Sequence, residues 1–283
     1  MPFLFAALLA LLSACGSTSH WPETLRDERG AALRYEVDGE GEPTLVFVHG
    51  WACKREYWYE TTRRFRQVRR VVALDLMGHG ESDAARTEWS MEAFAGDVVR
   101  VCDALGLQKV VLVGHSMGGV VALEAARRLG PRCVAVVGVE SLHDVARQLS
   151  PEEVDAFLEP FRADFTRATQ EFVRTELFPK DAEPRLSDLV ARDMSARPPA
   201  VALAVLEAYL RHDAAASLAA VTVPVHCINA KDGPWATNLA GNAALNPRFS
   251  AALMPGVGHF PMLEQSELFA RVLADFVRPL GGG

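Results

Sequence analysis

Residues 110–119 read VVLVGHSMGG, and this stretch decides the fold. The apolar run at 110–113 is typical of a strand covered on both faces, and the pattern from Met117 to Leu129 predicts a helix. The serine between them has a glycine two positions before and two positions after it. This spacing fits a G-x-S-x-G turn, in which a strained strand-to-helix corner presents the hydroxyl outward. We therefore expect Ser116 to be a nucleophile, the alternative being an ordinary glycine-rich turn.

Apolar runs similar to 110–113 recur on both sides of it and alternate with helical patterns from Ala32 onward. The other runs are 44–48, 71–74, 134–137, 223–228 and 249–254. Residues 89–105 have helical spacing, with Ser90 as the expected N-cap and Gly106 just past the end. Continuous apolarity favours strands buried on both faces. The pattern predicts an α/β fold with a mostly parallel central sheet flanked by helices.

Residues 141–212 interrupt this alternation, because they contain helix-like stretches and no strand-like run. The stretches span 151–165, 169–177, 186–194 and 199–210, and prolines separate them. We expect a helical cap inserted between core segments 31–140 and 213–283, with a last core helix at 264–277. The insertion carries Phe157, Phe161, Phe165, Phe172 and Leu177. They indicate either a hydrophobic substrate or ordinary packing against the core.

A serine hydroxyl needs an imidazole to take its proton and a carboxylate to fix the imidazole tautomer. His259 is the best placed histidine, because it follows the strand at 249–254 and a glycine-containing turn. Asp232 follows the strand at 223–228 on another loop, so we expect it to be the acid, although an aspartate before Gly-Pro can also be a turn-former. Glu140 and Asp144, after the strand at 134–137, are its rivals.

The oxyanion formed by attack on a carbonyl needs backbone N–H donors, each contributing about 3 kcal/mol. Met117 N–H lies at the expected start of a helix, where the peptide dipoles also favour negative charge. The second donor is expected just after the strand at 44–48, and we assign it to Trp51 N–H. The Trp51 side chain either contributes to the site or packs in the core.

Taken together, these motifs resemble the α/β-hydrolase superfamily, in the branch of small esterases, cofactor-free haloperoxidases and carbon–carbon bond hydrolases. The resemblance covers residues 31–279 and rests on His49-Gly50-Trp51, DLMGHGES at 75–82, GHSMGG at 114–119, Asp232 and Gly258-His259-Phe260. It implies that Asp75 and Gly78-His79-Gly80 are structural. Dehalogenases and epoxide hydrolases of this fold use an aspartate nucleophile, whereas position 116 is serine.

The resemblance and the serine together imply a serine hydrolase that cleaves a carboxylic ester or thioester of a small to medium hydrophobic substrate. The acyl group would be carried on Ser116. The alternatives are a carbon–carbon bond hydrolase with the same triad and a non-catalytic binding or signalling lipoprotein of this fold. The sequence contains no phosphate-binding loop, nucleotide fingerprint or metal-ligand cluster, so we expect no cofactor and no metal.

The first residues differ from the rest of the chain. Residues 1–12 are apolar, too short to span a bilayer but suited to a signal peptide, and they lead into Leu12-Ser13-Ala14-Cys15. This tetrad resembles a bacterial lipobox, although no Lys or Arg precedes it. We expect 1–15 to be a lipoprotein signal peptide, Cys15 to be the lipidated membrane anchor of an exported protein, and 16–30 to be a tether. The alternative is a cleaved secretory signal.

The composition of the chain favours some classes of binding partner over others. The net charge of -7 disfavours nucleic acid, and the arginine cluster at 63–70 is interpreted as a solvated helix face. We expect a small ester-like molecule as the binding partner, and the sequence does not define the oligomeric state. In an oxidising compartment, Cys53, Cys102, Cys133 and Cys227 would either form two disulfides, in one of three connectivities, or remain buried thiols.

Overall fold

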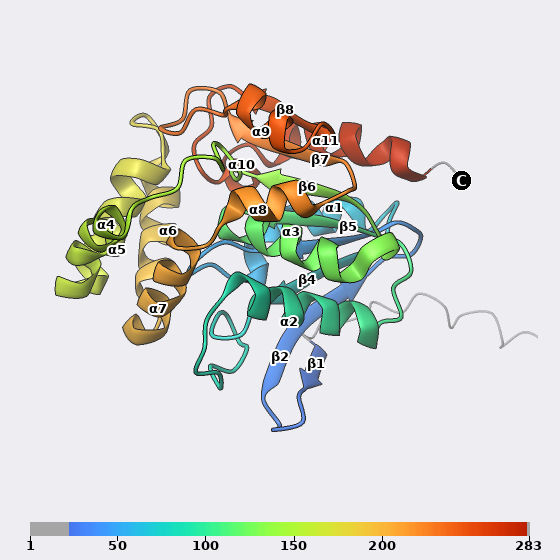
Figure 1. The fold of residues 1–283 in the computed structure, drawn as a ribbon, viewed down its shortest axis with the longest axis horizontal. Coiled ribbons are helices and arrows are strands. Elements are labelled where there is room, and N and C mark those ends of the chain that lie inside the picture. The colour runs from blue at the N-terminus through green and yellow to red at the C-terminus, as the bar shows by residue number, and fades with distance from the viewer. Residues whose placement is uncertain (1–22, 282–283) are drawn as a thin grey trace, which may run out of the picture.

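A computed structural model of the protein describes residues 23–281, which form an eight-stranded sheet with helices on both faces (Figure 1). The strand order is β1-β2-β4-β3-β5-β6-β7-β8. The strands are β1 (Glu23–Arg26), β2 (Ala32–Asp38), β3 (Thr44–Val48), β4 (Val71–Asp75), β5 (Val110–His115), β6 (Cys133–Val139), β7 (Val225–Ala230) and β8 (Phe249–Met254). The predicted α/β fold with a mostly parallel sheet is confirmed.

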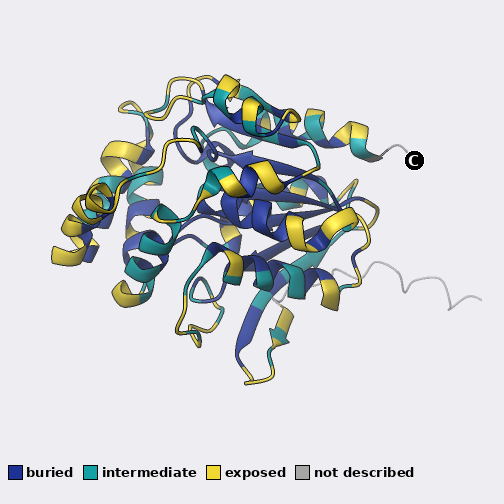
Figure 2. Ribbon diagram, viewed as in Figure 1, coloured by how far each residue is buried: buried dark blue, intermediate teal, exposed yellow. Residues whose placement is uncertain are grey.

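All strands of the sheet run in the same direction except β2. β2 pairs antiparallel with β1 and with β4, an edge hairpin that the sequence patterns did not reveal. β3, β4 and β5 are buried along their whole length, as continuous apolar runs predict. Figure 2 shows the buried sheet between partly exposed helices. The carboxyl ends of β3, β5 and β6 therefore meet at one edge of a rigid core.

Helices cover both faces of the sheet. α2 (Met91–Ala104), α3 (Met117–Leu129) and α8 (Ala214–Ala220) pack side by side on one face, and α1 (Tyr59–Phe65) packs with α11 (Ser266–Val277) on the other (Figure 1). Two short helices, α9 (Leu239–Leu245) and α10 (Pro261–Glu264), follow β7 and β8. The Ser90 hydroxyl caps α2 by accepting a hydrogen bond from Ala93 N at 3.1 Å, as its position predicted.

The stretch between β6 and α8 contains α4 (Pro151–Ala163), α5 (Phe165–Phe172), a π-helical turn (Val173–Leu177), α6 (Pro184–Ser195) and α7 (Pro199–Leu210). We call residues 141–212 the helical insertion; its helices lie to one side of the sheet in Figure 1. Ser150 begins α4 through a capping box with Glu153. The single helix expected at 169–177 is instead the end of α5 and the π-helical turn.

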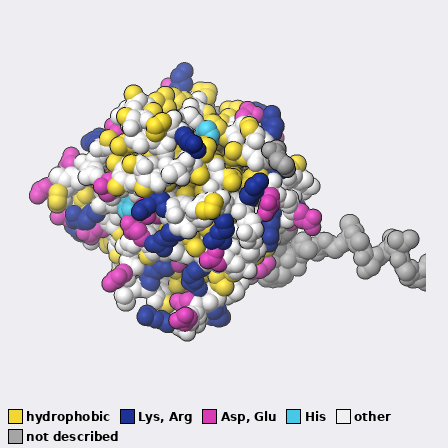
Figure 3. Space-filling view, turned by 45° about the vertical axis from the view of Figure 1, so that its right-hand side comes forward, with side chains coloured by type: hydrophobic (Ala, Val, Ile, Leu, Met, Phe, Trp, Pro, Cys, Tyr) yellow, Lys and Arg dark blue, Asp and Glu magenta, His cyan; other side chains and the backbone are white. Residues whose placement is uncertain are grey.

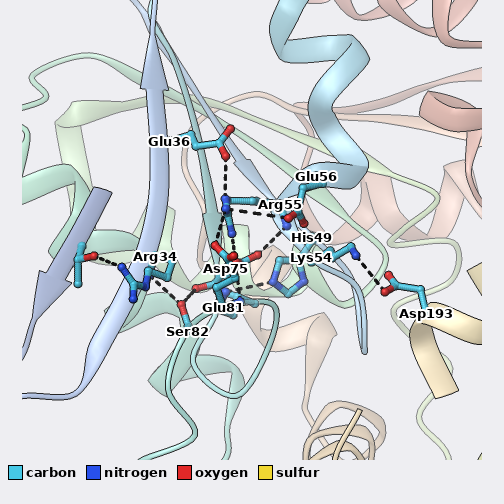
Figure 4. A network of polar contacts seen from close by, with 12 residues as sticks. Arg34, Glu36, His49, Lys54, Arg55, Glu56, Asp75, Glu81, Ser82 and Asp193 are labelled. Carbon is cyan, nitrogen blue, oxygen red and sulfur yellow. Dashed lines mark hydrogen bonds and ion pairs between the residues drawn. The ribbon is translucent and has the colours of Figure 1, made fainter. Parts of the chain in front are cut away.

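A buried ionic cluster fixes the loop after β4 (Figure 4). The Arg55 side chain, only 4% exposed, pairs with Asp75, with Glu36 at 3.0 Å and with Glu81 at 2.8 Å. Asp75 also accepts hydrogen bonds from Arg55 N at 2.7 Å and Glu81 N at 3.0 Å. A buried carboxylate with this many donors is a structural group, because removing one partner would leave an uncompensated charge. This geometry agrees with the structural role that the resemblance implied for Asp75.

Some expectations concern residues that the structure does not describe. The signal peptide, Cys15 and residues 16–22 of the proposed tether lie outside 23–281, whereas Glu23–Arg26, which we expected in the tether, form β1 of the sheet. Within 23–281, no helix has the length and apolarity needed to cross a membrane. Cys53, Cys102, Cys133 and Cys227 are buried free thiols. On the face seen in Figure 3, basic and acidic side chains are interspersed.

Candidate active site

Ser116 lies at the corner between β5 and α3, with φ 52° and ψ -121°. Positive φ is costly for a residue with a side chain, so this corner is strained as the G-x-S-x-G spacing predicted. The two glycines permit it through close backbone approach. A Cβ at Gly114 would lie 2.1 Å from Gly118 O, and one at Gly118 would lie 2.5 Å from Val48 O. Any larger residue at either position would therefore displace the corner.

The neighbouring strand β6 holds this corner in place. Ser116 N donates to Val139 O at 2.9 Å, and the Ser141 hydroxyl donates to Ser116 O at 2.7 Å. Asn229, at the end of β7, fixes Ser141 by accepting from its N–H and donating to its carbonyl, both at 3.1 Å. Sequence reasoning missed Ser141 and Asn229, since their roles arise only when β5, β6 and β7 lie together.

The carboxylate that faces His259 belongs to Glu140, directly after β6. His259 Nδ1 lies 3.4 Å from Glu140 Oε2, and the other carboxylate oxygen accepts a hydrogen bond from Ala230 N. Burial alone would raise the pKa of Glu140, but hydrogen bonds and charge from His143 and His259 lower it to about 2. Glu140 is thus an ionised, 2% exposed carboxylate pointing at a histidine.

Asp232, which we expected beside His259, lies elsewhere. Lys231 N continues the pairing of β7 with β8 by donating to Met254 O at 2.8 Å, so the chain is still extended one residue before Asp232. The following turn leaves Asp232 exposed, without a hydrogen bond or ion pair to His259. The rival Asp144 is also engaged elsewhere, since its carboxylate accepts from Asn238 Nδ2 at 3.1 Å. The structure therefore places Glu140 beside His259, and Ser116 lines the same cavity as both.

Several groups fix the backbone of the His259 loop. His259 N donates to Leu177 O in the helical insertion at 2.8 Å, and its carbonyl accepts from His115 Nε2 at 2.8 Å. The Glu264 carboxylate accepts from Gly258 N and Phe260 N, on either side of His259, at 2.8 Å each. Burial holds the pKa of His115 well below its usual range, so this histidine is a neutral donor. Its role here is structural, because it holds the carbonyl of His259.

The loop after β3 presents the second expected oxyanion donor. Cys53 N donates to Gly50 O at 3.2 Å and Ala52 has φ 56°, so residues 50–53 form a tight turn. His49 Nδ1 donates to Gly50 O at 2.8 Å, and its Nε2 accepts from Leu76 N at 3.0 Å. Burial lowers the pKa of His49 to about 4, which preserves this neutral tautomer. The loop that carries Trp51 N–H is thereby rigid.

The Trp51 side chain packs against the helical insertion. Its Nε1 donates to Ala202 O in α7 at 2.7 Å, and its ring meets those of Phe161 and Phe165 edge-on, with centroids 5.8 and 6.2 Å apart. Met117 is the first residue of α3, so its N–H has no acceptor within the helix. The backbone N–H groups of Trp51 and Met117, the two expected oxyanion donors, are therefore both held in fixed positions near Ser116.

A cavity of about 610 Å³ lies between the core and the helical insertion. Ser116, Glu140, His259 and Trp51 line its core side. The insertion contributes mainly apolar side chains, among them Phe157, Phe172, Leu177, Met194, Leu206, Tyr209 and Leu210. Phe161 and Phe165 instead contact Trp51, so the aromatic side chains of the insertion serve both roles that the sequence left open.

Backbone strain is concentrated around this cavity. The non-glycine residues with positive φ in the described chain are Ala52, Ser116, Glu140 and Leu142. Three of them line the cavity, and Ala52 lies between the lining residues Trp51 and Cys53. Strained residues persist where the surrounding structure fixes them, and they cluster at functional sites. Their position therefore supports an active site here, independently of the sequence motif.

Within residues 23–281, one group of side chains could offer three metal ligands, namely Glu92, Glu124 and His212. These side chains already have partners. Glu124 binds Arg127 at 2.8 Å and accepts from Ser217 Oγ at 2.7 Å, while His212 Nε2 also lies 2.7 Å from Ser217 Oγ. The group links α2 and α3 to the end of the insertion.

Residues 43–207, more than half of the chain, match the protein-family model described as the alpha/beta hydrolase fold. The chain belongs to this family. The α/β hydrolase is 27% identical over 260 residues to the pimeloyl-[acyl-carrier protein] methyl ester esterase of Yersinia enterocolitica, covering 87% of this chain and 97% of that protein.

Other relatives are matched over different lengths. An acetyltransferase component of the acetoin cleaving system from Pseudomonas putida is 29% identical over 88% of this chain and 67% of its own length. Epoxide hydrolase 4 of Mus musculus is 38% identical, but over only 34% of this chain and 27% of its own length. The chain thus spans less than a third of some curated relatives that it matches.

Solved structures agree on the fold. An esterase from Thermogutta terrifontis superposes with a TM-score of 0.79 at 24% identity, covering 93% of this chain and 100% of the other. A bromoperoxidase from Bacillus anthracis gives 0.80 at 19% identity, covering 91% and 100%. The family match and the named relatives support hydrolase chemistry of the esterase type.

Proposed function

We propose that this α/β hydrolase cleaves carboxylic esters or thioesters of small to medium hydrophobic acids through an acyl-enzyme on Ser116. The observation that carries the proposal is the contact between His259 Nδ1 and the ionised Glu140. A carboxylate that accepts a hydrogen bond from Nδ1–H leaves the other ring nitrogen, Nε2, free to accept a proton. His259 and the strained Ser116 line the same cavity.

In this mechanism, Ser116 Oγ attacks the substrate carbonyl while His259 Nε2 takes the hydroxyl proton. Glu140 stabilises the resulting imidazolium, and the N–H groups of Trp51 and Met117 donate to the oxyanion. When the tetrahedral intermediate collapses, the carbon–oxygen or carbon–sulfur bond breaks and His259 gives its proton to the leaving group. Water, activated by His259, then attacks the acyl-enzyme and releases the acid and free Ser116.

The cavity supports an apolar substrate of limited size. Its volume of about 610 Å³ lies in the range usual for small-molecule sites, and the helical insertion lines it with mainly apolar side chains. The Yersinia enterocolitica relative is named as a methyl ester esterase. An ester with a medium-length acyl chain would place the chain against Phe157 and Phe172 and its carbonyl at Ser116.

Covalent labelling tests the nucleophile. A fluorophosphonate probe should modify the folded protein at Ser116, as peptide mass spectrometry would show, and Ser116→Ala should abolish both labelling and turnover. Ser187→Ala, in the first turn of α6, is the matched control and should behave as wild type. Hydrolysis should be measured on p-nitrophenyl esters of graded acyl length and on a ring-cleavage diene. Absence of labelling would refute the enzyme assignment, and turnover of the diene alone would favour carbon–carbon hydrolysis.

A further inference from the structure

Glu140 faces a second imidazole, that of His143. His143 Nε2 lies 3.6 Å from Glu140 Oε2, the same oxygen that lies 3.4 Å from His259 Nδ1. The other oxygen of the carboxylate is already bonded to Ala230 N. Two histidines therefore share one carboxylate oxygen, whereas a catalytic triad needs only one histidine.

His143 is held in this position by its surroundings. Its carbonyl accepts from Asn238 N at 2.7 Å and from Asn242 Nδ2 at 3.3 Å, which fixes the loop between β6 and α4. Its ring packs near the Trp235 indole, with centroids 5.9 Å apart, and the same indole meets the His259 ring edge-on at 5.3 Å. The side chain is 15% exposed and lines the substrate cavity. Water and protons can therefore reach it.

We propose that His143 is a positioning residue that competes with His259 for Glu140 and so extends the activity of the base to lower pH. This inference rests on the function proposed above. A protonated His143 forms an ion pair with Glu140 and weakens the field that would otherwise stabilise a protonated His259. Two imidazolium ions on one carboxylate also repel each other, which disfavours the state in which both histidines carry a charge.

Other charged groups near His143 do not replace Glu140. In the described chain, Glu140 is the carboxylate within ion-pair distance of His143. The adjacent Asp144 is bonded to Asn238 Nδ2. Arg147, further along the same loop, and Asp232, in the loop after β7, are exposed and form no ion pair with His143. Two further groups lie near the pair. The His115 ring, 4.9 Å from that of His259, is kept neutral by burial, which lowers its pKa, and the Glu264 carboxylate accepts from Gly258 N and Phe260 N. The competition for the charge of Glu140 is therefore expected between His143 and His259.

The test compares the pH dependence of kcat/KM for wild type, His143→Gln and His143→Phe on a p-nitrophenyl ester. Both variants remove the charge, and Gln keeps a hydrogen-bond donor. We expect the acid limb, measured relative to each variant's own high-pH plateau, to move to higher pH by about half a unit to one unit in both variants. His226→Gln is the control, because His226 packs on Phe276 and has no contact with Glu140. An unmoved acid limb in both folded variants would overturn the inference.

A second measurement separates this inference from the proposed function. Proton NMR should follow the imidazole titrations of His259 and His143 in the Ser116→Ala protein, with and without His143→Gln. Loss of His143 should move the His259 titration to higher pH, whether or not the enzyme turns over esters. An unchanged His259 titration refutes the competition even if Ser116 is labelled. A shifted titration with an unshifted rate profile refutes its role in catalysis.

Discussion

Replacing Glu140 with glutamine should inactivate the enzyme while leaving its shape intact. The backbone N–H of Ala230 requires an acceptor, so the amide oxygen should take the place of Oε1. The amide NH₂ would then face His259 Nδ1, which must accept a hydrogen bond and carry its proton on Nε2. An Nε2–H cannot take the Ser116 proton. We expect kcat to fall by about 10⁴-fold, equivalent to about 5 kcal/mol in the activation barrier, with little change in KM.

The assay is steady-state hydrolysis of a p-nitrophenyl ester, with circular dichroism and thermal unfolding to verify the fold. Asp232→Asn is the matched control, because it makes the same chemical change at the exposed carboxylate. It should retain activity within about twofold, as for an ordinary surface change. If Asp232→Asn lost activity and Glu140→Gln retained it, the acid would be Asp232 and the assignment from geometry would be refuted.

Four further outcomes are expected. Because the pKa of Glu140 is lowered from 4.5 to about 2, its stabilising effect is fully present above pH 4.5 and lost as pH falls towards 2. Urea unfolding should therefore show a loss of about 3 kcal/mol over this range that Glu140→Gln lacks. Trp51→Phe removes the hydrogen bond to Ala202 O and should cost about 1 kcal/mol of stability together with a fall in kcat; unchanged values would contradict the fixed loop. Phe172→Ala should shift the preferred p-nitrophenyl ester to longer acyl chains, and an unshifted length profile would place the acyl group elsewhere. Expressed in a bacterium, the full chain should carry a diacylglyceryl group on Cys15 by mass spectrometry, and Cys15→Ser should abolish membrane association; a mature N-terminus at another residue would favour a plain secretory signal.

The fold and the strained corner at Ser116 could be predicted from the sequence because their signals are local. Continuous apolar runs define buried parallel strands, and the G-x-S-x-G spacing describes a corner whose geometry depends on its own glycines. α3 begins at Met117 and ends at Leu129 as the pattern predicted. The edge hairpin of β1 and β2 was missed because β1 is mostly exposed and carries no apolar pattern.

The carboxylate that faces His259 could not be identified from the sequence, since both candidates, Glu140 and Asp232, follow a strand of the same sheet. The choice depends on where the chain turns. Glu140 leaves β6 at once with φ 46°, which directs it to the His259 loop, whereas Lys231 is still paired to β8 before Asp232 is reached. The proposed role of His143 combines a local contact with Glu140 and the tertiary contact between Glu140 and His259, and the spacing within 140–143 does not reveal the second.

Two hydrogen bonds connect the helical insertion to the loops that carry His259 and Trp51. Leu177 O anchors the loop of the base, and Ala202 O anchors the indole beside the oxyanion donor. The loops that carry His259 and Trp51 are therefore held in part by the element that also lines the cavity. Under the proposed mechanism, exchange of this insertion for one of another specificity would have to retain both carbonyl anchors, so substrate range and catalytic competence would change together.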